Sequence, residues 1–166
     1  MKAIAITVAA VALSRLAWAD DPACQPVYQS MERLAATPSH QWTSQTNSGS
    51  KPITSEIVTL GDSRYLQVGG VWKRIPYSTA ESIKQQAEQR KDRTSTCRAV
   101  RDEAIDGASA SLVAVHTVAG DNASDQQVWI SKSSGLPVRQ VIDIGGITHM
   151  EIRYSYTNVV APAGVK

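Results

Sequence analysis

The apolar positions of residues 25–36 repeat with the spacing of a helix. Val27, Met31 and Leu34 recur at i, i+4 and i+7, which places them on one stripe of a helical surface. Pro38 follows two residues after this segment, where a helix cannot readily continue. The pattern therefore predicts a helix over 25–36 that packs one apolar face against another element.

After Pro38 the pattern changes to a period of two. Short runs rich in β-branched and aromatic residues are separated by clusters of Gly, Asn, Asp and Ser. Gly69-Gly70, between two of these runs, tolerates the positive φ angles of a tight hairpin turn. We expect antiparallel strands over 41–46, 53–60, 64–68 and 71–75.

A second helix is predicted midway along the chain. Ser78-Thr79-Ala80-Glu81 has the form of a capping box, and it opens a helix that runs toward Arg93. The apolar stripe of this helix consists of only Ala80, Ile83 and Ala87. We therefore expect a lightly packed helix, which serves either as a mobile cover or as a surface strut.

The last third of the chain predicts a meander of antiparallel strands. In the final strand Met150, Ile152 and Tyr154 alternate with polar residues, so one face of the sheet turns inward and the other faces water. Residues 120–125 show no periodicity and are predicted to form a polar loop. The expected strands cover 98–105, 110–118, 127–132, 136–144 and 148–159.

Residues 1–19 have the composition of a signal peptide. Lys2 precedes an apolar run over 3–13, and Ala17-Trp18-Ala19 is a small-x-small cleavage signal. The run is too short to cross a bilayer, and Cys24 lies too far beyond the cleavage point for an acyl anchor. We therefore expect a cleaved leader over 1–19, one domain over 20–166, no transmembrane anchor, and a periplasmic destination, with the extracellular medium as the second choice.

Cys24 and Cys97 are the two cysteines of the chain. An even pair in an exported protein is most often bridged, and the spacing offers neither a C-x-x-C motif nor a second pair for zinc. We expect a disulfide that joins the start of the first helix to the chain after the second.

The charge balance gives no argument for a nucleic-acid partner. The formal charge of +2 falls to about zero when Lys2 and Arg15 leave with the leader. The basic residues between 84 and 101 alternate with acidic ones, which is typical of a solvated face.

No catalytic or metal-binding constellation stands out. His40, His116 and His149 lie apart from one another, on separate predicted strands, without a second ligand at metal spacing. Asp102 and Glu103 are adjacent on a strand and point to opposite faces, which does not suit an acid and base pair. We predict a protein that is not an enzyme and uses no metal or cofactor.

Large apolar side chains lie on several of the predicted strands. A curved sheet can gather such residues on one concave face beneath a helix, where they would bind a ligand, or they can simply fill the core. The candidate apolar face consists of Trp42, Trp72, Trp129, Met150, Ile152, Tyr154 and Tyr156.

The segment 127–139, with its strand, turn and Gly135-Leu136-Pro137 hairpin, resembles the half-barrel superfamily of LolA-like and LolB-like periplasmic lipoprotein carriers. Residues 154–159 are similar to the last strand of that family, and 103–107 add weaker similarity. The resemblance implies an incomplete antiparallel barrel around helices, with an apolar cavity that holds acyl chains in the lipid carriers. The chain departs from the carriers in lacking Phe and in having the cysteine pair.

Together these observations predict an α+β fold, with a strongly curved antiparallel sheet, an open half-barrel, packed on two helices. The hypothesis for function is a monomeric, non-catalytic carrier of a lipophilic or amphipathic ligand, such as a lipid or acyl chain. The alternative is an envelope protein-interaction or accessory scaffold domain, in which an exposed edge or loop binds a protein partner.

Overall fold

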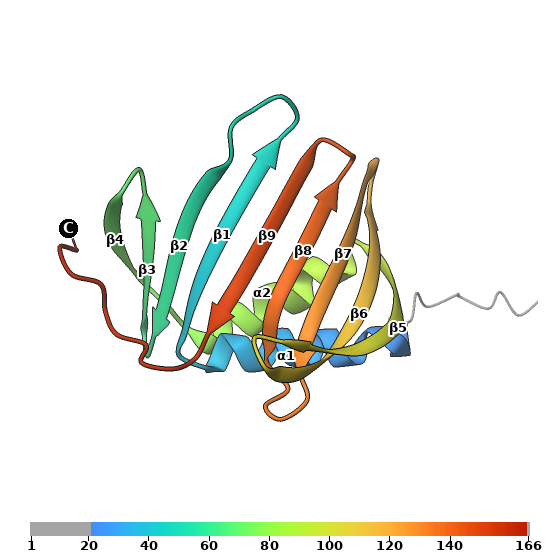
Figure 1. Cartoon of the computed structure of the whole chain (residues 1–166), viewed down its shortest axis with the longest axis horizontal. Helices are drawn as coiled ribbons and strands as arrows, with labels where there is room; N and C mark the ends of the chain where they lie inside the picture. The colour runs from blue at the N-terminus through green and yellow to red at the C-terminus, as the bar shows by residue number, and fades with distance from the viewer. Residues whose placement is uncertain (1–20, 166) are drawn as a thin grey trace, which may run out of the picture.

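A single antiparallel sheet of nine strands curves around two helices (Figure 1). The computed structural model describes residues 21–165. The strand order is β4-β3-β2-β1-β9-β8-β7-β6-β5, so β1 and β9 bring the two halves of the chain together at the centre. The strands are β1 (Ser39–Asn47), β2 (Ile53–Leu60), β3 (Ser63–Val68), β4 (Val71–Pro76), β5 (Thr94–Ile105), β6 (Ala108–Ala119), β7 (Asn122–Ser131), β8 (Pro137–Ile144) and β9 (Thr148–Ser155).

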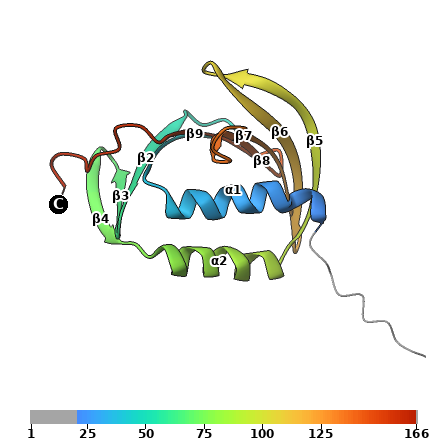
Figure 2. The same ribbon diagram turned by 90° about the horizontal axis from the view of Figure 1, so that it is seen from below.

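Helix α1 (Gln25–Ala36) lies in the concave side of the sheet, as Figure 2 shows. A short 3₁₀ turn, η1 (Pro22–Cys24), leads into it, and Pro26 occupies the first helical turn, where its missing N–H costs no hydrogen bond. Val27, Ser30 and Ala35 are buried. The helix predicted over 25–36 is confirmed, because its apolar stripe is the face that meets the sheet.

Helix α2 (Thr79–Lys91) lies on the far side of α1 from the sheet (Figure 2). The Ser78 hydroxyl accepts a hydrogen bond from the backbone N–H of Glu81 at 3.3 Å, which forms the predicted N-cap. Arg90 and Glu32 connect the two helices through an ion pair of 3.1 Å. All residues of α2 are described and none is buried, so the prediction of light packing is confirmed.

The core has two parts, one on each face of the sheet. The first joins Val27 of α1 to Val113, Val115, Val128 and Ile130 on the concave face. The second contains Ala110, Leu112 and Trp129. The register of β5 against β6 shifts between Ala99 and Arg101, and the end of this hairpin projects on the side of the sheet opposite the helices (Figure 2).

The disulfide prediction is confirmed, because Cys24 and Cys97 are bonded with a Cα–Cα distance of 5.0 Å. The α+β open half-barrel is also confirmed. The polar loop predicted over 120–125 is wrong. β7 already begins at Asn122, and Gly120, with a φ of 57°, helps make a short turn instead. The predicted leader over 1–19 lies outside the described residues.

Candidate functional site between the sheet and the helices

A cavity of about 360 Å³ lies between the concave face of the sheet and the two helices. Helix α1 supplies one wall through its apolar stripe, and one face of α2 supplies another. The helical lining residues are Val27, Tyr28, Met31, Leu34, Ala35, Ser82, Gln86, Gln89 and Arg90, with Arg93 just beyond α2. The sheet contributes Gln41, Ile57, Thr59, Arg64, Ser95, Val115, Thr117, Gln126 and Gln140.

The floor of the cavity carries a row of hydrogen-bonded polar side chains. The Tyr154 hydroxyl donates to Gln140 Oε1 at 2.9 Å, and Gln140 Nε2 donates to Gln126 Oε1 at 3.0 Å. Burial raises the pKa of the Tyr154 hydroxyl, which keeps it in the neutral, donating form. The row spans β9, β8 and β7, so it connects three strands through polar side chains that satisfy one another.

Basic side chains stand at both ends of α2 along the cavity. Arg90 is paired with Glu32 and lies 4.7 Å from the centre of the Tyr28 ring. Arg93 follows the end of α2 and donates to the backbone oxygen of Gln89 at 2.8 Å. Arg64 lies near the start of α2, since its guanidinium stacks over Tyr77 at 4.3 Å. The cavity therefore combines an apolar wall with a cationic lining.

The seven residues of the candidate apolar face do not share one face. Tyr154 pairs with Gln41, which lines the cavity, and Ile152 and Met150 follow on β9 at a spacing of two, so these three belong to the concave face. Tyr156, just beyond β9, donates its hydroxyl to the backbone oxygen of Pro137. Ligand binding by these residues stays a prediction.

The three tryptophans of the candidate apolar face lie on the convex face, opposite the concave side where they were expected. Trp42 neighbours Gln41 along β1 and pairs with Glu56 and Arg153 instead. Leu66 points to the concave face, because it pairs with the cavity-lining Ile57. The next residue, Gln67, therefore points to the convex face, and so does its partner Trp72. The physical reason is that successive side chains of a strand point to opposite faces of the sheet, whereas residues that pair across strands share a face. Trp42 follows a concave position and Trp72 pairs with a convex one, so both point away from the helices.

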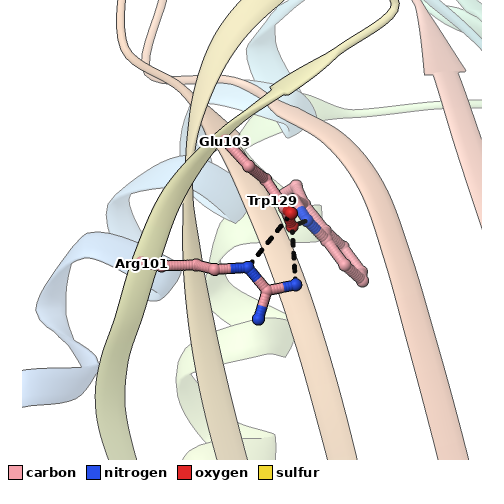
Figure 3. Close-up of polar contacts among 3 residues, drawn as sticks. All are labelled: Arg101, Glu103 and Trp129. Atoms are coloured by element: carbon pink, nitrogen blue, oxygen red, sulfur yellow. Dashed lines mark hydrogen bonds and ion pairs between the residues drawn. The ribbon is translucent and has the colours of Figure 1, made fainter.

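Trp129 is buried on the convex face, with 4% of its surface exposed, beneath the end of the β5–β6 hairpin. Its indole Nε1–H donates to the Glu103 carboxylate, and Arg101 Nε donates to the same carboxylate at 3.1 Å (Figure 3). The Arg139 guanidinium lies 4.9 Å from the centre of the indole ring. The Trp129 hydrogen bond is the main reason that the pKa of Glu103 is lowered. These contacts hold the hairpin end against the sheet, and they account for Trp129 as a core residue.

Trp42 belongs to an aromatic group on the convex face that is centred on His40. Its ring stacks on His40 at 3.9 Å between centroids, and Trp72 meets the same histidine edge-on at 6.5 Å. His40 Nε2 lies 2.8 Å from the Glu56 carboxylate. Trp42 is 40% exposed, whereas Trp72 is half-buried. We refer to His40, Trp42 and Trp72 as the outer aromatic patch.

The described residues contain no cluster of three or more His, Cys, Asp or Glu side chains with the geometry of a metal site. His116 and His149 are each paired with one aspartate, Asp125 at 2.8 Å and Asp143 at 2.7 Å. Within residues 21–165, no helix has the length and apolar character needed to span a membrane.

Sequence reasoning missed the polar members of the site. Gln41, Gln126 and Arg64 interrupt apolar alternation on the concave face, and their polarity argued for the outside of the sheet. The sequence did indicate the face of Gln140. It lies two residues from both Val138 and Ile142, and residues at that spacing on a strand point to the same face. The cationic end formed by Arg64 and Tyr77 depends on tertiary contact between β3 and the segment before α2, so no local pattern could reveal it.

Comparison with known proteins supports the architecture. No protein-family model matches the chain, and no curated protein is similar to it. The structure of MucB in complex with MucA(peri) aligns with a TM-score of 0.53 and 14% identity over 86% of this chain. This chain spans 60% of the length of that MucB chain. The likeness shows that the matched part of MucB has the same overall fold as this chain.

Two further solved structures align more distantly. LprF from Mycobacterium bovis has 13% identity and a TM-score of 0.47, over 89% of this chain and 99% of its own. A LolA superfamily protein from Nitrosomonas europaea has 9% identity and a TM-score of 0.27, over 80% and 91%.

Proposed function

We propose that this protein is a non-catalytic binding or carrier protein for a lipophilic or amphipathic ligand, such as a lipid or acyl chain. The observation that carries the proposal is the cavity between the concave face and the helices, one wall of which is the apolar stripe Val27, Met31 and Leu34. Its volume of about 360 Å³ falls within the range of small-molecule sites, toward the lower end.

The packing of α2 supports entry of a ligand from the helical side. No residue of α2 is buried, and its connection to α1 includes the ion pair of Arg90 with Glu32. Displacement of α2 therefore exposes little apolar surface of its own, so the free energy needed to move it is small compared with that of a core helix. In the proposal α2 acts as a movable cover.

A tryptophan placed in the cavity from α2 tests the proposal. Gln86 lines the cavity, whereas its neighbour Gln85 is exposed and does not. Gln86→Trp should reduce binding of the neutral apolar probe N-phenyl-1-naphthylamine at least tenfold, and Gln85→Trp, on the same helix, should leave it unchanged. Fluorescence titration measures both. Equal binding by the two variants, or no binding by the unsubstituted protein, would sink the proposal.

Export to the periplasm, as a monomer after removal of residues 1–19, is part of the same proposal. The bonded pair Cys24 and Cys97 supports it, because disulfides persist in oxidising compartments. Mass spectrometry of the protein from a periplasmic fraction tests this point: the expected chain begins at Asp20 and contains one disulfide. A chain that retains Met1, or that has free thiols, would contradict it.

The second candidate is an envelope protein-interaction domain, which the outer aromatic patch favours. Trp42 is exposed on the convex face, and exposed aromatic residues are enriched in protein interfaces. MucB, which shares the fold, is seen in complex with MucA(peri). A photo-crosslinking residue at position 42 should capture one defined envelope protein. The same residue at Ser44, which is exposed on the same face of β1, is the control.

A further inference from the structure

The charged side chains that line the cavity are all positive. Arg64, Arg90 and Arg93 are among its described lining residues, and no Asp or Glu is. The Glu32 carboxylate, which is not part of the lining, forms an ion pair with Arg90 at 3.1 Å. Among the ion pairs of residues 21–165, none includes Arg64 or Arg93. Two positive charges at the cavity are therefore not compensated by a carboxylate within the described part of the protein.

Arg93 uses two of its three guanidinium nitrogens in hydrogen bonds within the protein. Its Nε donates to the backbone oxygen of Gln89 at 2.8 Å, and its Nη2 donates to Gln89 Oε1 at 3.0 Å. These bonds satisfy the last turn of α2, where a cation is also favoured by the helix dipole. Arg93 additionally lines the neighbouring cavity, which contains Asp92. The hydrogen bonds that Arg93 makes at the C-terminal end of α2 are sufficient to explain its position.

Arg64 is held in place but keeps its terminal nitrogens free. Nε donates to the Thr59 hydroxyl at 3.3 Å, and the guanidinium stacks on the Tyr77 ring at 4.3 Å. The Tyr77 hydroxyl in turn donates to the backbone oxygen of Ala35 at 2.8 Å, which anchors the ring to the end of α1. Within the described residues, Nη1 and Nη2 of Arg64 donate no hydrogen bond. A positioned guanidinium with two unused terminal nitrogens is suited to bidentate binding of a carboxylate or phosphate.

The apolar stripe of α1 leads away from this arginine. Tyr77 ties the Arg64 end of the cavity to Ala35, next to Leu34. From Leu34 to Val27 the helix rises by roughly 10 Å, at 1.5 Å per residue. An extended hydrocarbon chain along this stripe would have its polar end beside Arg64.

We propose that Arg64 binds the anionic head group, a carboxylate or phosphate, of an amphiphile whose chain lies along Val27, Met31 and Leu34. This inference rests on the proposed function, and it adds the charge of the ligand and the residue that recognises it. Thr59 and Tyr77 are the positioning residues of the site, because they orient the guanidinium without themselves being charged.

The test is displacement of N-phenyl-1-naphthylamine by three amphiphiles with the same chain length, below their micellar concentrations. Dodecanoate or dodecyl phosphate should displace the probe at a concentration at least tenfold lower than neutral dodecan-1-ol, since charge-assisted hydrogen bonds contribute at the site. Arg64→Gln should remove this preference, so that all three amphiphiles displace the probe at similar concentrations relative to that variant's own probe affinity. Arg64→Lys, which keeps the charge but loses the bidentate fork, should retain part of it.

Arg74→Gln, on the neighbouring strand β4 and outside the cavity lining, is the matched control and should retain the full preference for the anions. Probe binding with equal displacement by all three amphiphiles would overturn the inference and leave the proposed function standing, as would an unchanged preference in Arg64→Gln. Absence of probe binding would overturn the proposed function itself. Near-ultraviolet circular dichroism and urea unfolding establish that each variant is folded before its titration is compared.

Discussion

The Asp21 carboxylate accepts a hydrogen bond from the backbone N–H of Cys97 at 3.0 Å, next to the disulfide that joins Cys97 to Cys24. The other carboxylate oxygen of Asp21 accepts from the N–H of Ala23 at 3.0 Å. A hydrogen bond and a disulfide thus connect the start of α1 to the first half of β5. They fix the end of the helix that forms the wall of the cavity.

Removal of the disulfide should lower the free energy of unfolding by about 4 kcal/mol. The bonded cysteines are 73 residues apart, and the chain-entropy model gives this magnitude for such a loop. The double variant Cys24→Ser, Cys97→Ser is compared with the unsubstituted protein by urea unfolding. The unsubstituted protein unfolded in the presence of dithiothreitol should match the double variant. A loss below about 1 kcal/mol would contradict the expectation that the link constrains the unfolded chain.

Asp21 should stabilise the fold in a pH-dependent way. The backbone N–H groups of Cys97 and then Ala23 lower the pKa of its carboxyl below 3.8. A carboxyl with a depressed folded-state pKa contributes its full stabilisation above the ordinary value and loses it as the pH falls through the folded-state pKa. Asp21→Asn should therefore destabilise the protein at pH 6 more than at about pH 2.5. Urea unfolding at both values measures the difference.

Asp121→Asn, in the exposed turn between β6 and β7, is the control for that experiment. It removes the same charge from the surface without touching the hydrogen bonds at the disulfide. A stability difference of the same size and pH dependence in both variants would assign the effect to overall charge.

Tyr154→Phe should cost about 1 to 3 kcal/mol of unfolding free energy. The substitution keeps the ring but leaves Gln140 Oε1, in a buried side chain, without its donor at 2.9 Å. Thermal and urea unfolding measure the loss. Tyr65→Phe is the matched control, because no hydrogen bond of the Tyr65 hydroxyl is present among the described residues, and it should change stability little.

The protein should lose stability at alkaline pH. Burial raises the pKa of Tyr154 and Tyr156, and their mutual repulsion when ionised raises that of Tyr156 further. Groups whose folded-state pKa exceeds the unfolded value of 10.0 contribute stability below that value and lose it as the pH rises above it. Tyrosinate absorbance should show two of the five tyrosines resisting ionisation until the protein unfolds. Ionisation of all five together in the folded protein would disprove this.

Glu103 should hold the end of the β5–β6 hairpin against the convex face. Its carboxylate accepts from Trp129 and Arg101, so Glu103→Ala should accelerate amide hydrogen exchange in residues 103–110. Glu103→Gln keeps an acceptor for the indole N–H and should accelerate exchange much less. Equal acceleration in both variants would show that charge, not the Trp129 hydrogen bond, holds the hairpin.

The parts of this fold that depend on local pattern were predictable from the sequence. The spacing of Val27, Met31 and Leu34 specifies the helical face, because side chains at i, i+4 and i+7 meet on any α-helix. Period-two alternation and turn residues indicated all nine strands, although β5 begins earlier and β7 begins earlier than their patterns suggested. Polar residues at the ends of these strands obscured the boundaries, since both faces are solvated there.

By itself, the sequence determined which segments become helices and strands, and its even pair of cysteines predicted the disulfide. Only the tertiary structure decided which face of each strand encloses the helices. Trp129 shows why: alternation separates its side chain from Val128 but does not say which of the two faces is concave. The hairpin end folds over the convex face and buries Trp129 there, whereas α1 packs on Val128. The curvature of the sheet and the position of the helices over it arise from contacts between residues distant along the chain. Those contacts also place Arg64 at the cavity.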